Sequence, residues 1–380
     1  MSYQLNFDWS VFMHKYWQKK PVLIRQAITD FVDPIEANEL AGLAMEKEID
    51  SRLVSHQQGQ WQVSHGPFSD YQGLGEHNWS LLVQAVNHWH PAAAELMLPF
   101  RVLSDWRIDD LMVSYSVKGG GVGPHVDQYD VFIIQGQGSR RWRVGDNTHL
   151  TQHRAHPSLL LVDDFEAIID AIMLPGDILY IPPGFPHEGT SLQESLNYSV
   201  GFRAPCGREL ISDFADYLLA HDLGADRFQD PNQPQRDLPA RIMDCELADI
   251  QQLMLSTLQQ PTQFKNWFGQ FISQSRHDLN LIIPEVPFSP EELISQLQQG
   301  DKLYRLPGVR MLVIDNQLFI NGEVFSSLTD TQMYTLTSQL NLTWHEIQRD
   351  LSHPSFINEL TRMLNSGFWY FESPEEDEDD

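Results

Sequence analysis

The apolar residues of the chain change their spacing near residue 108, and the new pattern predicts strands. From there to about residue 205, short runs rich in Val, Ile, Tyr and Phe, such as DVFIIQG, SLLLVDD and SLNYSVGFR, alternate with Gly, Pro and Asp. Runs of this length and composition, bounded by turn residues, are typical of β-strands. Because strand follows strand with few helices between them, we predict a β-sandwich or barrel in this part of the chain.

The segments on either side of this block show a helical spacing. Before it, residues 33–49 predict a helix with Pro34 in its first turn, residues 79–100 predict another helix broken near Pro91, and residues 22–24 predict a strand. After it, amphipathic patterns at 207–223 and in IQQLMLSTLQQ and FKNWFGQFISQ predict a helical unit. Short amphipathic helices bury little surface alone, so we expect this unit to pack on a neighbouring domain or on a second copy of the chain.

The last hundred residues predict a separate α+β unit. In SPEELISQLQQ, Ser289 stands at the cap of a helix, with Pro290 at its first position and Glu292 at its third. The segment VRMLVIDNQLFINGEVF predicts a hairpin, and further helical patterns follow it. A helix, a hairpin and short helices together suggest a winged-helix-like fold. The final EEDEDD is a block of like charge and should be disordered.

The charge balance narrows the classes of partner. The formal net charge is −27, from 52 acidic and 25 basic residues. This argues against a general nucleic-acid binder, because affinity for phosphate requires a basic face. A strongly acidic surface would instead attract a basic partner, although the same charge could serve only to keep the protein soluble.

Cysteine content and hydropathy indicate the compartment. The two cysteines, Cys206 and Cys245, are too few for a disulfide framework or a thiolate zinc site. The opening MSYQLNFDWSVF lacks the basic start and apolar centre of a signal peptide. No apolar run approaches the roughly 20 residues that span a bilayer. We therefore expect a cytoplasmic protein without membrane association.

The stretch GPHVDQYDVF contains a candidate metal site. A strand sends alternate side chains to opposite faces, so His125 and Asp127 point the same way and Val126 points the other. A third ligand is available in GDILYIPPGFPH, where the prolines stiffen the backbone ahead of His187. Two histidines and one carboxylate are the facial triad of non-haem Fe(II) oxygenases, which leaves coordination positions open for a cosubstrate and O2. A His-x-Asp pair alone could equally be a surface or turn pair; the later His187 segment favours the metal site.

An oxygenase that uses a 2-oxoacid also needs a cation for the distal carboxylate of that cosubstrate. The segment GQGSRRWRVGD offers Arg140, Arg141 and Arg143, and alternation places Arg140 on the face of Trp142. A buried arginine can hold a carboxylate with two parallel hydrogen bonds. All three could instead be solvent-facing arginines beside acidic neighbours, and spacing alone does not choose among them.

Three segments resemble the JmjC-type ribosomal oxygenases of the cupin superfamily: YWQKKPVLIRQA, GGGVGPHVDQYDVFIIQGQGSRRWRVGD and PGDILYIPPGFPHEGTSLQESLNYSVGFR. The resemblance covers most of the chain and implies a mixed α/β (α+β) fold around a double-stranded β-helix, or jelly-roll. On this basis we expect an oxygenase domain over 1–205, with its jelly-roll core at about 100–205. A helical dimerisation region over 206–280, a winged-helix-like domain over 281–374 and an acidic disordered tail over 375–380 would follow.

The resemblance also implies roles for individual residues. The iron ligands would be His125, Asp127 and His187. Arg140 stands where related enzymes bind the distal carboxylate of 2-oxoglutarate, and Ser114 matches a position that helps to hold the same carboxylate. Asn197 lies on a late core strand, where it could face the metal or be a structural asparagine.

The implied activity is Fe(II)- and 2-oxoglutarate-dependent hydroxylation of an arginine side chain of large-subunit ribosomal protein L-sixteen, with O2 as the second cosubstrate. Such an enzyme would be a homodimer that does not bind nucleic acid directly. An arginine substrate requires an acidic or aromatic-walled entrance, for which Asp130 and Glu188 are candidates, although either could be a solvated loop carboxylate. The alternatives are the same chemistry on another basic protein, or a non-catalytic metal-binding cupin.

Overall fold

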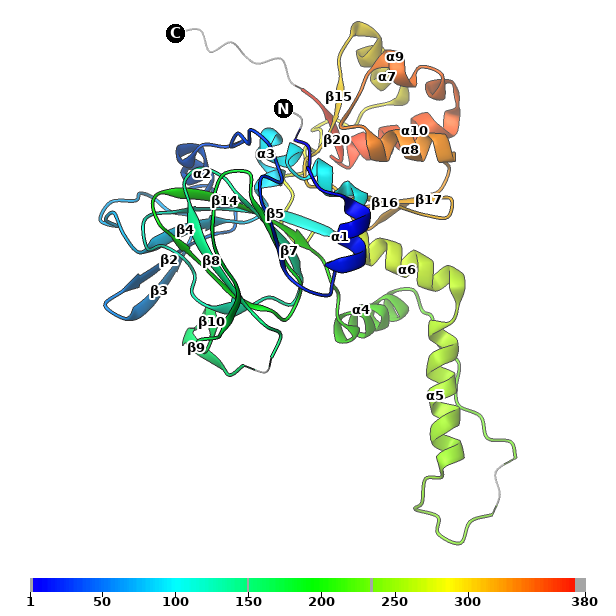
Figure 1. The fold of residues 1–380 in the computed structure, drawn as a ribbon. Coiled ribbons are helices and arrows are strands. Elements are labelled where there is room, and N and C mark those ends of the chain that lie inside the picture. The colour runs from blue at the N-terminus through cyan, green and yellow to red at the C-terminus, as the bar shows by residue number, and fades with distance from the viewer. Residues whose placement is uncertain (1–2, 149, 233–234, 373–380) are drawn as a thin grey trace.

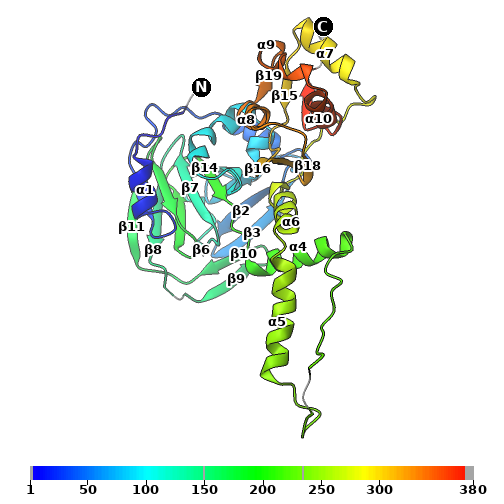
Figure 2. The same cartoon turned by 90° about the vertical axis from the view of Figure 1, so that its right-hand side faces the viewer.

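The computed structural model describes residues 3–148, 150–232 and 235–372, and the expected acidic tail at 375–380 lies outside them. An antiparallel eight-stranded sheet forms the larger part of the β structure (Figures 1 and 2). Its strands, in spatial order, are β1 (Val22–Ile24), β12 (Ile178–Ile181), β7 (Asp130–Gln135), β14 (Ser195–Phe202), β5 (Ile108–Ser116), β4 (Trp79–Val83), β2 (Ser51–Gln57) and β3 (Gln60–His65).

A smaller sheet faces part of the larger one. Its strands, in spatial order, are β11 (Ala167–Met173), β8 (Arg140–Gly145), β13 (Pro186–Ser191) and β6 (His125–Val126). A separate hairpin consists of β9 (Gln152–His156) and β10 (Leu159–Val162). The two facing sheets make the jelly-roll predicted for the middle of the chain.

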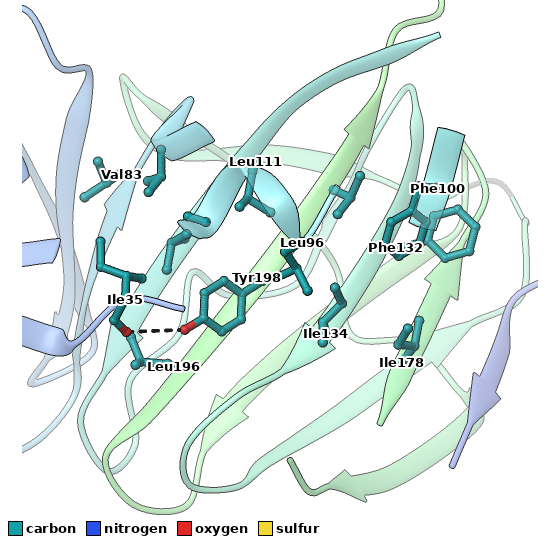
Figure 3. Packing of buried hydrophobic residues seen from close by; sticks show 14 of the residues in the cluster. Ile35, Val83, Leu96, Phe100, Leu111, Phe132, Ile134, Ile178, Leu196 and Tyr198 are labelled. Carbon is teal, nitrogen blue, oxygen red and sulfur yellow. Dashed lines mark hydrogen bonds between the residues drawn. The ribbon is translucent and has the colours of Figure 1, made fainter. Parts of the chain in front are cut away.

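Strand β7 is apolar at successive positions because both of its faces are covered. Val131 and Ile133 pack with Trp142 of β8, between the two sheets. Phe132 and Ile134 point to the other face and belong to a larger apolar cluster, part of which is drawn in Figure 3. All six residues of β7 are buried, because a strand covered on both faces loses the polar alternation of a half-exposed strand.

The larger cluster lies between the eight-stranded sheet and the N-terminal helices. These are α1 (Trp9–Lys15), α2 (Ala37–Leu43), η1 (Val86–His88), α3 (Pro91–Glu95) and η2 (Leu98–Val102). Tyr198 of β14 crosses this layer. Its hydroxyl donates to Asp33 Oδ1 at 2.8 Å and lies 3.5 Å from the carbonyl oxygen of Ile35, the contact drawn in Figure 3. Burying each large apolar side chain here contributes about 1.5–3 kcal/mol to folding, which fixes one face of the sheet and leaves the other free to form a site.

Two predictions for the N-terminal part were wrong in whole or in part. Residues 79–83 form strand β4, paired with β2 and β5, instead of opening a helix. The helix predicted over 33–49 is confined to α2. The apolar run at the start of 79–100 is compatible with either a buried strand or a helix. It forms a strand because β2 and β5 each offer an edge with which it can pair.

Three helices follow the jelly-roll as predicted: α4 (Gly207–Ala220), α5 (Asp244–Leu258) and α6 (Pro261–Ser273). Helix α6 packs on the C-terminal unit, whereas α5 projects away from the rest of the protein in both views and contains no buried residue (Figures 1 and 2).

The C-terminal unit has its own apolar core. Its elements are α7 (Pro290–Gln299), β15 (Leu303–Arg305), β16 (Met311–Ile314), β17 (Gln317–Ile320), β18 (Glu323–Phe325), α8 (Asp330–Ser338), β19 (Asn341–Leu342), α9 (Trp344–Ile347), η3 (Asp350–Ser352), α10 (Pro354–Asn365) and β20 (Trp369–Phe371). The predicted cap of α7 is confirmed: Ser289 Oγ accepts from Glu292 N at 3.2 Å, and Ser289 N donates to Glu292 Oε2 at 2.8 Å. The predicted hairpin is extended by a third strand, β18.

The C-terminal unit also contacts the jelly-roll directly. Arg310 donates to Asp109 Oδ1 of β5 at 3.2 Å and to the carbonyl oxygen of Trp106 at 2.8 Å. Over the described ranges, every helix is too short or too polar to cross a bilayer.

Candidate active site

The structure brings the three predicted metal ligands together on the smaller sheet. His125 of β6 stands opposite His187 of β13 in the antiparallel register, and Asp127 follows β6 directly. One donor atom from each of the three side chains lies within 4.8 Å of the other two. His187 Nε2 is 3.5 Å from Asp127 Oδ2, and His125 Nε2 is 3.9 Å from Asp127 Oδ1. These distances suit three ligands that surround one ion.

Each imidazole is held by its other ring nitrogen. His125 Nδ1 donates to the carbonyl oxygen of Gly123 at 2.9 Å, and His187 Nδ1 donates to that of Phe185 at 3.0 Å. A carbonyl can only accept, so Nδ1 carries the proton in both rings and Nε2 keeps a lone pair for a metal. Both carbonyls lie two residues before their histidine, so the local chain orients each ring.

The electrostatics of the three side chains also suit a divalent cation. Burial, assisted by the nearby His187, lowers the pKa of His125 to about 4. Burial alone would raise the pKa of Asp127, but its contacts with His187 and His125 and the charge of Arg52 hold that pKa at about 2. Near neutral pH His125 is therefore an uncharged imidazole and Asp127 an ionised carboxylate, which are the states that bind a metal.

The three side chains line a cavity of about 330 Å³ that also contains Arg140. Arg140 of β8 is only 5% exposed, and burial lowers the pKa of its guanidinium to about 10. Among the described residues no carboxylate pairs with it. A buried cation without an anionic partner costs several kcal/mol. An anion that enters this cavity would therefore find a fixed partner in Arg140.

The other two candidate arginines are already paired elsewhere. Arg141 binds Asp170 through two hydrogen bonds of 2.7 and 2.6 Å on the outer surface of the small sheet. Arg143 binds Glu188 at 2.6 Å and Asp164 at 3.1 Å. The structure thus distinguishes Arg140 from its neighbours, which the spacing of the sequence could not do.

Serine hydroxyls hold the Arg140 guanidinium in place. Its Nη2 donates to Ser116 Oγ of β5, and its Nε donates to Ser191 Oγ of β13 at 3.1 Å. Ser114 lies two residues before Ser116 on the same strand and lines the same cavity, but Ser116 makes the contact with Arg140. Sequence reasoning missed Ser116 and Ser191, because a serine in a buried strand carries no pattern of its own.

Asn197 of β14 lines the cavity as well, opposite Ser114 in the register of β5 and β14. Its Nδ2 donates to Gln135 Oε1 at 3.0 Å. Its Oδ1 is buried without a hydrogen-bond partner in the described part of the protein. A buried amide oxygen in this state can accept a hydrogen bond from a ligand.

The prediction that Asp130 and Glu188 lie at the substrate entrance was wrong. Asp130 is fully buried and accepts hydrogen bonds from Arg107 and Tyr180, and Glu188 is paired with Arg143. Neither is among the residues that line the cavity.

The cavity has a different acid and an aromatic ring that the sequence reasoning did not single out. Within the described residues, its acidic side chains are Asp127 and Asp110, and Tyr129 is 44% exposed in its wall. Asp110 is the second of two adjacent aspartates at the start of β5, and it belongs to no motif that would have singled it out in the sequence.

Comparison with known proteins agrees with this geometry. A family model for the JmjC domain matches residues 95–210, and a model for the ROXA-like winged helix matches residues 256–370. The ribosomal protein uL16 3-hydroxylase of Escherichia coli is 56% identical over 98% of this chain and 100% of its own length. This chain belongs to the JmjC-type ribosomal oxygenases. A probable ribosomal oxygenase of Haemophilus influenzae is 35% identical over 84% of this chain and 82% of its own.

Solved structures of a ribosomal oxygenase from Escherichia coli, YcfD, have the same fold. One is 56% identical, covers 98% of this chain and 100% of its own, and superposes with a TM-score of 0.95. Another, determined in complex with cobalt and 2-oxoglutarate, is 55% identical with equal coverage and a TM-score of 0.91. The predicted family, the jelly-roll core and the C-terminal winged helix are confirmed.

Proposed function

We propose that this ribosomal oxygenase hydroxylates an arginine side chain of large-subunit ribosomal protein uL16 (L-sixteen), using Fe(II), 2-oxoglutarate and O2. The observation that carries the proposal is a single cavity with three convergent metal ligands and a buried guanidinium, Arg140, that has no acidic partner within the described ranges. The identity to the uL16 3-hydroxylase of Escherichia coli supports the choice of substrate.

Fe(II) fits the three ligands His125, Asp127 and His187. Two neutral imidazoles and one carboxylate, without thiolate, match the ligand preference of non-haem iron. Bound there, Fe(II) supplies the means to couple decarboxylation of 2-oxoglutarate and reduction of O2 to oxidation of an unactivated C–H bond. The protein keeps the ligands in their metal-binding tautomers through the carbonyl oxygens of Gly123 and Phe185.

2-Oxoglutarate fits the remainder of the cavity. Arg140, held by Ser116 and Ser191, would bind its distal carboxylate with charge-assisted hydrogen bonds. Ser114 would add a hydroxyl to the same subsite, and Asn197 would direct its Oδ1 toward the metal end.

The substrate arginine would enter between Asp110 and Tyr129. A guanidinium prefers a carboxylate partner and packs well on an aromatic face, and these two side chains offer both in the wall that also contains Asp127. Asp110 would bind the guanidinium and Tyr129 would cover it, so that a methylene of the side chain lies near the metal ligands.

The remaining features fit a basic protein substrate. The net charge of −27 favours encounter with a ribosomal protein and disfavours direct binding of nucleic acid. The exposed apolar residues of α5, among them Leu247, Ile250 and Met254, support a homodimer formed through the helical region. We propose a cytoplasmic location, where uL16 is available before ribosome assembly.

The test is succinate release from 2-oxoglutarate with Fe(II) and ascorbate, measured with and without purified uL16. We expect release to be stimulated by uL16 and to be accompanied by an arginine heavier by one oxygen atom. Stimulation by a different basic protein, but not by uL16, would assign the same chemistry to another substrate. No turnover with any basic protein would favour a non-catalytic metal-binding cupin.

A further inference from the structure

The two carboxylate oxygens of Asp110 have different surroundings. Oδ2 accepts a hydrogen bond from Ala85 N at 3.0 Å and lies 3.5 Å from His277 Nε2. Oδ1 lies beside Gly201, where an added Cβ would approach it to 3.3 Å. Gly201 and Asp110 both line the active-site cavity. One oxygen is therefore anchored from behind, and the other lies beside the cavity wall.

The anchor comes from the part of the chain that leads into the winged helix. Ser275 Oγ donates to the carbonyl oxygen of His277 at 2.7 Å and accepts from His277 N at 3.2 Å. Ser275 N donates to Asn321 Oδ1 at 3.1 Å, in the turn between β17 and β18, and Gly322 N of that turn donates to Ser273 Oγ at 2.9 Å. A series of hydrogen bonds thus joins the winged helix to His277.

The cations nearby engage the neighbouring aspartate. Arg310 Nη1 lies 3.2 Å from Asp109 Oδ1, and Arg276 Nη1 lies 3.6 Å from Asp109 Oδ2. Successive residues of a strand point to opposite faces, so Asp109 meets both arginines while Asp110 faces His277 and the cavity. In the described structure the side chain nearest to Asp110 Oδ2 is the imidazole of His277, at 3.5 Å, whereas Arg276 acts on Asp110 only at longer range.

We propose that His277 is a positioning residue for the arginine pocket, through which the winged helix contributes to substrate affinity without touching the substrate. The proposal rests on the proposed role of Asp110 as the acceptor of the substrate guanidinium. Together with Ala85 N, His277 holds Oδ2 and restricts the rotation of the carboxylate, so that Oδ1 remains directed to the incoming guanidinium. Without His277, only the hydrogen bond from Ala85 N holds Oδ2, and the acceptor is less well ordered.

The test compares full-length wild-type enzyme with His277→Ala, His277→Gln, Asp110→Asn and the double variant His277→Ala/Asp110→Asn. His345→Ala, at an exposed histidine of α9, is the control. The Michaelis constants for uL16 and for 2-oxoglutarate, kcat, and substrate-independent succinate release are measured, with thermal unfolding as a check on folding.

We expect His277→Ala to raise the Michaelis constant for uL16 roughly tenfold, because the acceptor oxygens of Asp110 lose one of the contacts that order them. The constant for 2-oxoglutarate and substrate-independent turnover should stay at the wild-type values. His277→Gln, which keeps an N–H donor, should recover part of the loss, and the double variant should be no worse than Asp110→Asn alone. His345→Ala should match the wild type.

An unchanged constant for uL16 in His277→Ala would overturn the positioning role, as would additive losses in the double variant or an equal rise in the constant for 2-oxoglutarate. Wild-type enzyme that fails to oxidise uL16 would overturn the proposed substrate and this proposal together. The wild-type measurement therefore separates failure of the proposed function from failure of the role of His277.

Discussion

At the scale of single residues, partners distinguish the side chains that can act from those that only stabilise. Arg140 and Arg143 lie on one strand, but their partners differ. Arg143 is neutralised by Glu188 and Asp164, whereas Arg140 donates to serine hydroxyls, lies near the Trp142 ring and has no acidic partner among the described residues. Burying a cation without an anionic partner lowers the stability of the folded protein, and other interactions in the fold must offset that cost. The position of Arg140 in the cavity that contains the proposed metal ligands is the basis of its proposed role in binding an anion.

Loss of one ligand should remove activity without unfolding the protein. We expect Asp127→Ala and His187→Ala each to lower uL16-dependent succinate release by more than about 100-fold, because loss of a direct ligand should exceed the 10–100-fold effect of losing a group behind one. Thermal unfolding should show an intact fold, and Asp164→Ala, at an 85% exposed carboxylate, should keep wild-type activity. Full activity in either ligand variant would remove that residue from the metal site.

The three arginines offer a matched comparison for cosubstrate binding. Arg140→Ala should raise the Michaelis constant for 2-oxoglutarate at least about tenfold, because a charge-assisted pair with its distal carboxylate is lost. Arg141→Ala, which removes only a surface pair with Asp170, should leave that constant unchanged. Equal constants in wild type and Arg140→Ala would place the distal carboxylate elsewhere.

The sequence allowed us to predict the site residues that belong to a motif, but not those that stand outside any motif. His125, Asp127 and His187 stand in motifs with distinctive spacing. Ser116 and Asp110 are recognisable only by what lies across the cavity from them, which depends on the register of β5 with its neighbours. Spacing could not select Arg140, because the acids that pair with the other arginines are distant along the chain.

At the scale of elements, two segments must pass close together to bring the histidines into contact. The glycine-rich loop before β6 runs beside β13, and Gly121 approaches Gly189 so closely that a Cβ at Gly121 would collide with the carbonyl oxygen of Gly189. β13 begins with Pro186 and His187. The small size of Gly121 therefore sets the distance between the loop that leads to His125 and the strand that contains His187.

A single methyl group in this contact should disturb the metal site. We expect Gly121→Ala to lower the free energy of unfolding by about 1–3 kcal/mol through overpacking, and to weaken Fe(II) binding measured by anaerobic titration. Gly42→Ala, in α2 with open space around it, should be neutral or stabilising by up to about 1 kcal/mol. Tight Fe(II) binding by Gly121→Ala would show that the loop does not set the ligand spacing.

Strand-rich and helix-rich regions could be separated from the sequence, but not every element within them. The short runs of Val, Ile, Tyr and Phe between residues 108 and 205 and the capping residues of α7 are local signals, and the structure agrees with them. β4 was predicted as a helix, because a short apolar run is ambiguous until its pairing with β2 and β5 is known.

At the scale of the whole molecule, helix α5 projects from the rest of the protein and contains no buried residue. Its residues Leu247, Ile250 and Met254 follow a helical spacing and are 52%, 42% and 63% exposed. An apolar stripe of this kind on a projecting helix is costly in water. A second copy of the chain would cover it, which is the basis of the proposed homodimer.

Charged residues on this stripe should separate the copies. We expect Ile250→Asp/Met254→Asp to elute as a monomer when its mass is measured by light scattering, while the wild type elutes as a dimer. Gln252→Asp, at an exposed position on the opposite side of the same helix, should remain dimeric. A wild-type protein that is monomeric at micromolar concentration, or a double variant that is still dimeric, would contradict an interface through α5.

The central claim is that this cavity oxidises an arginine of uL16, and mass spectrometry of uL16 from host cells tests it most directly. With the gene present, we predict an arginine heavier by one oxygen atom. The modification should disappear when the gene is deleted, return with the wild-type gene, and stay absent when Asp127→Ala is supplied instead. An unmodified uL16 in wild-type cells, or a modified one in the deletion strain, would contradict the account.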